Sequence, residues 1–132
     1  MVILSLPSID NSTVQFFNRN HIDVVFVENT VKDSGIPMSE DMAYAALTLI
    51  SDRKNLPLLI VCKSGKNLTG VVTACLRKMQ RWSLISIYEE FRRYAAGWLS
   101  LRSQQQLEQF IELFDTDPIP FDSSTAPAFL NR

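Results

Sequence analysis

Residues 58–70 read LLIVCKSGKNLTG, and the expected architecture of the chain follows from them. Four apolar residues, which predict a strand, run into a short loop that contains Gly65, and a helical pattern follows. A loop between a strand and a helix N-terminus binds anions, because unpaired backbone N–H groups converge there and the helix dipole adds partial positive charge. A thiol at that point, here Cys62, ionises more readily to a nucleophilic thiolate, and Lys66 adds a charge beside it.

Alternating strand and helix signals surround this stretch. Short apolar or β-branched runs at Val2–Leu6, Asp23–Val27 and Leu58–Val61 predict three strands. Helical spacing of apolar residues predicts helices after Ser39, after residue 70 and after Ser83, with Ser39 as the N-cap of the first. Ser103, followed by Gln106 in a capping-box pattern, predicts the start of the last helix. The order indicates an α/β fold with a short parallel sheet flanked by helices.

Size and composition limit the chain to one domain. With 132 residues and 46% hydrophobic composition, we expect a single core over residues 1–115 and a C-terminal tail over residues 116–132, rich in Pro and Ser, that lies on the surface or is partly disordered. A formal net charge of −1 gives no overall field for nucleic acid or an anionic membrane. The longest apolar run, Leu56–Cys62, is much shorter than the ~20 residues of a membrane span. We therefore expect neither nucleic acid nor membrane as a partner.

The two cysteines, Cys62 and Cys75, have no disulfide-framework or metal-ligand spacing. We expect no metal, no cofactor and a cytoplasmic location. Cys75 falls on an apolar helical stripe and is predicted to be core. His21 precedes a strand and has no nearby ligand-type residue, so a surface or capping role is favoured. The basic residues Arg77, Lys78 and Arg81 are predicted to lie on a solvated helix face.

Beyond the loop, LRKMQRWSL at residues 76–84 and EEFRRYA at residues 89–95 carry a family resemblance. From Val2 to Asp115, the chain resembles the plant and fungal atypical dual-specificity phosphatases, the branch associated with inositol pyrophosphates and with oxidant-induced cell-cycle arrest. The resemblance implies a cysteine-phosphatase, dual-specificity-like fold. Family members carry a further strand and helix upstream, which this chain is expected to lack, and an exposed sheet edge invites a partner.

The loop departs from the family pattern of His, Cys, five residues, Arg, then Ser or Thr and Gly. Val61 stands at the histidine position and Leu68 at the arginine position. The arginine fork binds two phosphoryl oxygens and neutralises charge during transfer, which leucine cannot do, so a rate loss of roughly 10³-fold or more is expected. The resemblance then implies a pseudophosphatase with a degenerate nucleophile, Cys62. The implied phosphate-binding residues are Lys63, Ser64, Gly65, Lys66, Asn67, Leu68, Thr69 and Gly70.

The family also places a general acid on the loop after the second strand of this chain. Asp33 and Glu28 are the candidates, and Asp33 is the one we select. Beside Ser34 and Gly35, Asp33 also fits an ordinary solvated turn carboxylate. Cys62 likewise has a structural interpretation, as a buried thiol that ends an apolar strand.

Three functions stay open at this point. The first is a catalytically impaired phosphatase-like protein that binds a phosphorylated small molecule or phosphoprotein, or associates with family members in a homo- or hetero-oligomer. The second is an active dual-specificity or inositol-pyrophosphate phosphatase that uses Cys62 as nucleophile. The third is a purely structural interaction module.

Overall fold

A three-stranded parallel sheet organises the molecule. The computed structural model describes residues 2–6, 9–27, 38–63, 67–95 and 99–130. The strands are β1 (Val2–Leu6), β2 (Asp23–Phe26) and β3 (Leu58–Cys62), in the order β2-β1-β3. The register pairs Val2 with Asp23 on one side and with Leu58 on the other. The predicted strands are confirmed, although β2 ends one residue earlier than predicted and β3 runs one residue further, to Cys62.

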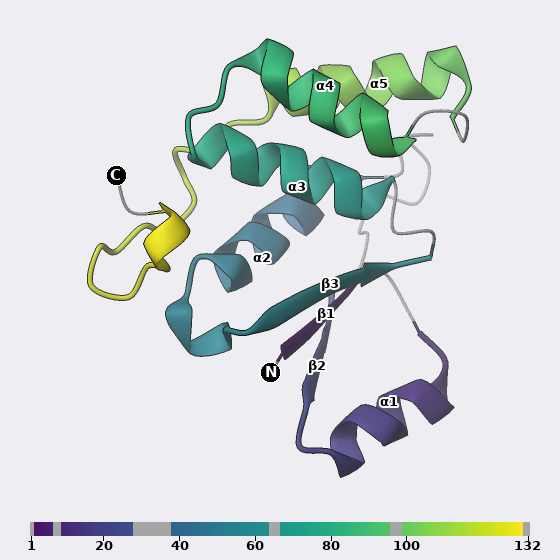
Figure 1. Ribbon diagram of the computed structural model, residues 1–132, viewed down its shortest axis with the longest axis vertical. Coiled ribbons are helices and arrows are strands. Elements are labelled where there is room, and N and C mark those ends of the chain that lie inside the picture. The colour runs from purple at the N-terminus through teal and green to yellow at the C-terminus, as the bar shows by residue number, and fades with distance from the viewer. Residues whose placement is uncertain (1, 7–8, 28–37, 64–66, 96–98, 131–132) are drawn as a thin grey trace.

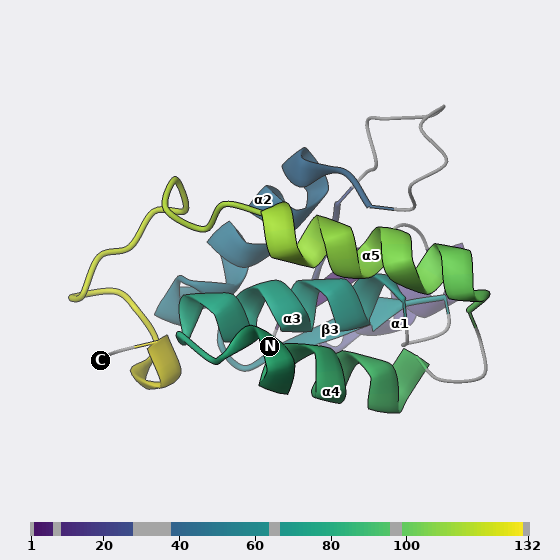
Figure 2. The same cartoon turned by 90° about the horizontal axis from the view of Figure 1, so that it is seen from above.

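Helices cover the two faces of the sheet unequally. α1 (Asn11–Arg19) lies on one side, and α2 (Glu40–Ile50), α3 (Leu68–Met79), α4 (Leu84–Ala95) and α5 (Leu101–Leu113) lie on the other (Figure 1). Figure 2 shows α3 between α4 and α5, above β3. The fold is therefore α/β, as the alternation of strand and helix patterns predicts.

The core lies between the sheet and the four-helix layer. Leu4 from the central strand is fully buried, as are Leu47 of α2 and Val72 of α3. Cys75 of α3 is also fully buried, and this burial raises the pKa of its thiol to about 12. Its neutral form is the one that the core accommodates, in agreement with the predicted structural role.

Serine and aspartate side chains cap the N-termini of most of the helices. Ser39 Oγ accepts a hydrogen bond from the Met42 N–H, so the predicted N-cap is confirmed. Ser83 Oγ accepts one from the Ser86 N–H at the start of α4. The last predicted helix is present as α5, but its predicted start at Ser103 is wrong. Ser100 is the N-cap of α5, and its Oγ accepts a hydrogen bond from the Ser103 N–H at 3.1 Å. Ser103 is thus already inside the first turn.

Basic side chains tie the helix layer together. Lys78 Nζ, from α3, donates hydrogen bonds to the carbonyls of Ile111, Glu112 and Phe114, at the end of α5. Arg77 pairs with Glu90 of α4. The prediction of a solvated basic face is therefore wrong for Arg77 and Lys78, which are half-buried between helices.

The segment after α5 packs back against the domain. Ile119, Ala126 and Leu130 are buried, and a 3₁₀ turn spans Ala128–Leu130. The backbone N–H of Arg53, in the 3₁₀ turn Arg53–Asn55, donates to the Thr125 carbonyl at 2.9 Å. The described part of this segment, to residue 130, thus contributes buried side chains rather than lying on the surface throughout.

Candidate functional site

The predicted nucleophile lies at the carboxyl end of the sheet. Cys62 is the last residue of β3, and α3 begins six residues later at Leu68. Thr69 Oγ1, in the first turn of α3, donates a hydrogen bond to Cys62 Sγ at 3.0 Å. Both side chains are half-buried. The fold therefore brings the thiol and the helix N-terminus into direct contact, although they are seven residues apart.

The N-terminus of α3 differs from those of the other helices because its cap is open. Asn67 is the N-cap residue, but its side chain makes no capping hydrogen bond, and its Oδ1 is buried without a hydrogen-bond partner among the described residues. Asp10, Ser39, Ser83 and Ser100 close the first turns of α1, α2, α4 and α5 with side-chain oxygens. Within the described part of the chain, no side chain caps the first turn of α3, so its N–H groups are open to an anion.

Two positions of the loop have different roles. Leu68 is half-buried, and its side chain packs against the hydrophobic core. Gly70 lies against α4, where a Cβ atom would be 3.2 Å from Phe91 Cε2, so a side chain at this position would require the Phe91 ring to shift by a few tenths of an ångström. The close packing of α3 on α4 therefore explains why the predicted motif has a glycine at position 70.

The remaining predicted site residues divide into two groups. Lys63 follows β3 and is exposed. Ser64, Gly65 and Lys66 lie outside the described residues, and so do the general-acid candidates Asp33 and Glu28. Among the residues that the structure describes, no group of three or more His, Cys, Asp or Glu side chains is arranged to hold a metal ion.

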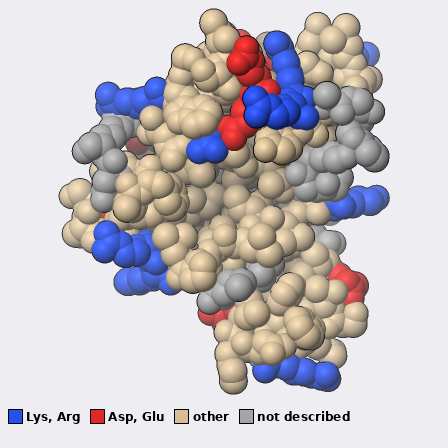
Figure 3. All heavy atoms as spheres, in the orientation of Figure 1, with Lys and Arg blue, Asp and Glu red and all other residues tan. Residues whose placement is uncertain are grey.

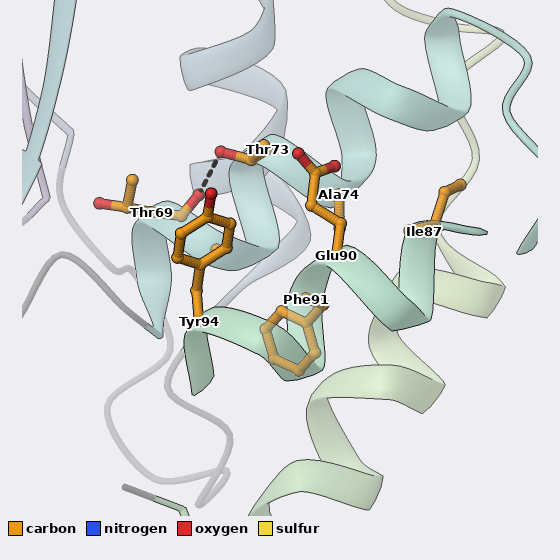
Figure 4. A pocket seen from close by; sticks show the side chains of 8 residues that line it. Thr69, Thr73, Ala74, Ile87, Glu90, Phe91 and Tyr94 are labelled. Atoms are coloured by element: carbon orange, nitrogen blue, oxygen red, sulfur yellow. Dashed lines mark hydrogen bonds between the residues drawn. The ribbon is translucent and has the colours of Figure 1, made fainter. Parts of the chain in front are cut away.

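A cavity of about 280 Å³ opens beside Thr69, between α3 and α4. It is lined by Thr69, Gly70, Thr73, Ala74, Ile87, Glu90, Phe91 and Tyr94. Figure 4 shows Glu90 and Tyr94 extending from α4 toward Thr73 and Thr69 of α3. Thr73 Oγ1 donates to the Thr69 carbonyl at 2.8 Å. The lining is apolar with a few hydroxyl groups, and it continues from the residue that contacts Cys62.

The Glu90 carboxylate, which lines this cavity, is neutralised from outside it. Arg77 Nε and Nη2 donate to the two oxygens of Glu90, each at 2.9 Å. These hydrogen bonds lower the pKa of Glu90 and raise that of Arg77. Arg77 also lies 4.2 Å from the Trp82 ring centroid and donates to Gln80. Glu90 is thus fixed in position and contributes little net charge to the cavity.

Sequence patterns alone did not reveal this cavity. Thr69 and Thr73 are four residues apart on α3, and Glu90 and Tyr94 are four apart on α4, so each pair shares a helix face. That spacing was the available signal. Which face of α3 meets which face of α4 depends on the packing, which one amphipathic pattern does not specify.

The strand, thiol, loop and open helix N-terminus together define a cysteine-phosphatase fold. The family model described as "Tyrosine phosphatase family" matches residues 1–131, and the chain belongs to that family.

Curated relatives carry phosphatase names. "Probable tyrosine-protein phosphatase DG1060" of Dictyostelium discoideum is 47% identical over 94 residues, covering 71% of this chain and 53% of the relative. "Inositol diphosphatase DSP4" of Arabidopsis thaliana is 38% identical over 102 residues, covering 76% and 50%. The chain thus spans about half the length of these relatives.

A solved structure agrees with the fold. The core catalytic domain of the PP-IP phosphatase SIW14 from S. cerevisiae, in complex with citrate, superposes with a TM-score of 0.75 at 32% identity. The match covers 89% of this chain and 69% of that one. The predicted family and fold are confirmed.

None of the helices in the described residues has the length and the apolar composition that a membrane span requires.

Proposed function

We propose that this chain is a catalytically impaired member of its family, which binds phosphorylated ligands at the loop of residues 62–70. The observation that carries the proposal is the place of Leu68. It begins α3 at the position that the family pattern gives to arginine, and its side chain packs on the core. A leucine there supplies no charge and no hydrogen bond to a phosphoryl group.

Binding and catalysis place different demands on this loop. A phosphoryl group in the ground state can be held by the open N–H groups of α3, by the helix dipole and by Lys66. Transfer to the thiolate also requires that charge be neutralised as it moves, which is the role of the bidentate arginine. Its absence is expected to lower the rate roughly 10³-fold or more while sparing part of the binding.

The relatives suggest the class of ligand. Some are named as tyrosine phosphatases and others as inositol diphosphatases, so a phosphoprotein and a phosphorylated inositol are the candidates. The net charge of −1 does not attract anions over long distances, so recognition of a phosphorylated ligand depends on the local charge of the loop. The proposal places the protein in the cytoplasm, because a thiol in such a loop fits a reducing compartment.

An active phosphatase is the second candidate, favoured by one contact. The Thr69 hydroxyl donates to Cys62 Sγ at 3.0 Å, a hydrogen bond that favours the thiolate over the thiol. In this alternative Cys62 attacks phosphorus, Lys66 replaces the arginine in part, and Asp33 protonates the leaving group. A third alternative, a structural module whose loop binds no anion, would leave the open cap of α3 without a role.

Calorimetric titration of the purified chain with an inositol pyrophosphate, at fixed ionic strength, tests the proposal. We expect saturable binding, weakened about tenfold by Lys66→Ala, the loss expected for one charge-assisted hydrogen bond. Lys54→Ala is the matched control, because Lys54 is exposed and precedes β3 at the opposite end of the strand from the loop. No binding, or equal weakening by both variants, would count against phosphate recognition at the loop.

A further inference from the structure

A second cavity, of about 500 Å³, lies at the C-terminal end of α3, beside the segment that follows α5. It is lined by Met79, the last residue of α3, and by six residues of that segment. Figure 1 shows the yellow segment beside this end of the helix. Because α3 has 12 residues, Met79 lies about 16 Å from Leu68 along the helix axis. The cavity is therefore separate from the loop of residues 62–70.

Hydrogen bonds to the body of the domain hold the segment of residues 115–130 in place. Gln80 Nε2 donates to the Phe129 carbonyl at 3.1 Å. Arg53 Nη2 donates to the Ala126 carbonyl, also at 3.1 Å. The wall of the cavity is thus anchored. Its volume falls in the range of roughly 300–1,000 Å³ that is typical of small-molecule sites, which are largely preformed.

The floor of the cavity is apolar. Met79, Ile119 and Leu130 line it and are buried. Phe121 also lines it but is 54% exposed, which places its ring at the mouth. A ligand between this ring and the floor would remove apolar surface from water, and that removal is a main source of affinity in such sites.

The polar lining of the cavity consists of three side chains that carry oxygen atoms, namely Thr116, Asp117 and Ser123. Asp117 is exposed, and no hydrogen bond or ion pair between described residues engages its carboxylate. Within the same part of the chain, the hydroxyl groups of Thr116 and Ser123 also make no hydrogen bond. Three acceptor oxygens are therefore available to a ligand.

The charges around Asp117 favour a cation. Partial burial, followed by the negative charges of Asp115, Glu40 and this carboxylate, raises the pKa of Tyr44. The ammonium group of Lys78 donates instead to three carbonyls at the end of α5. On the face drawn in Figure 3, Lys and Arg side chains are scattered among uncharged and acidic ones rather than gathered into one patch, so no broad positive field opposes a cation there.

We infer that this cavity binds a small primary amine with an aromatic body. An ammonium group has three N–H donors and no acceptor, which matches the three acceptor oxygens of Thr116, Asp117 and Ser123. The aromatic body would lie on the apolar floor beside Phe121. A phosphorylated ligand would meet the Asp117 charge without a basic group among the lining residues. The inference is independent of what the loop of residues 62–70 binds.

Titration of the isotope-labelled chain with tryptamine, followed by NMR at low ionic strength, tests the inference. We expect saturable shifts of amide signals in residues 116–123, with a dissociation constant on the order of 1 mM, and no shift at Thr69. The ethylindole that lacks only the ammonium group, and indolepropionate with its opposite charge, should bind about tenfold more weakly or not at all. Equal affinity for the three compounds, or shifts that do not saturate, would overturn the inference.

A substitution of the carboxylate provides a second readout. Asp117→Asn should weaken tryptamine binding about tenfold and leave the weak binding of ethylindole unchanged, because only the charge is removed. Glu89→Gln is the matched control, because Glu89 is exposed on α4 and no described residue of α4 lines the cavity. Equal weakening by both variants would indicate a general charge effect and contradict the role given to Asp117.

Discussion

The Arg77–Glu90 pair should stabilise the domain more than an ordinary surface ion pair does. Two parallel hydrogen bonds of 2.9 Å join the guanidinium to the carboxylate, and the two side chains are only 27% and 22% exposed. A charge-assisted bidentate contact with this burial is expected to contribute about 1.5–3 kcal/mol of coupling free energy. The change to make is a double-mutant cycle with Arg77→Met and Glu90→Gln.

The assay is urea unfolding at pH 7, with the Arg92–Glu108 pair as an internal comparison. Arg92 also binds its carboxylate through two nitrogens, at 2.6 and 2.9 Å, but it is 52% exposed, so about 0.2–1 kcal/mol of coupling is expected. Arg77→Met alone should cost more than the coupling, because it also removes the contact with Trp82. Equal coupling for the two pairs, or less than about 0.5 kcal/mol for Arg77–Glu90, would refute the reasoning.

The pH dependence of this coupling has a defined sign. The hydrogen bonds from Arg77 lower the pKa of Glu90 in the folded chain. The carboxylate therefore contributes stability above its unfolded pKa of about 4.3, and this contribution is lost as the pH falls through the lower folded pKa. The coupling measured at pH 7 should thus shrink under acid. A coupling that grows on acidification would contradict the assignment.

Four further substitutions are expected to change stability. Lys78→Met should cost about 1.5–3 kcal/mol in urea unfolding, because the last carbonyls of α5 lose their charged donor; an unchanged midpoint would show that the tether is not stabilising. When the pH is raised from 8 to 10, the Cys75→Val variant should lose about 1.4 kcal/mol less unfolding free energy than the unmodified chain does. Folding raises the Cys75 pKa from 9.0 to about 12, so the unfolded chain ionises first and the unmodified chain loses stability as the pH rises above 9. Identical pH profiles of stability for the two proteins would contradict this reasoning. Arg81→Gly and His21→Gly should each stabilise the folded chain by about 1 kcal/mol and raise its melting temperature. Each residue follows a helix and has a φ near 60°, where glycine has no steric penalty. Lowered melting temperatures would oppose this.

The sheet and most of the helices could be predicted because their signals are local. Apolar runs gave the three strands, and Ser39 and Ser83 gave two helix starts. The start of α5 was misplaced because Ser100 and Ser103 both satisfy the local rule. Ser103 is followed by Gln106, but Ser100 is the residue whose hydroxyl meets the first-turn N–H. Competing caps three residues apart cannot be ranked by pattern.

Other features depend on contacts between distant segments. Lys78 on an amphipathic helix looks solvated until α5 is placed beside it. Ile119 and Leu130 follow no helical or strand period, so the pattern did not indicate their burial. The cavity beside Thr69 likewise needs the α3–α4 packing, which Gly70 permits. The cysteine at the end of the third strand was predictable because strand, glycine loop and helix are contiguous in the chain.

The most direct test of the account is phosphatase turnover with an inositol pyrophosphate and a generic aryl phosphate as substrates. The unmodified chain is compared with Leu68→Arg, with Cys62→Ser and with the combination of the two. The account predicts that the unmodified chain is silent, and that Leu68→Arg gains activity of roughly 10³-fold or more, which Cys62→Ser abolishes. Cys62-dependent turnover by the unmodified chain, unchanged by Leu68→Arg, would contradict the central role given to Leu68.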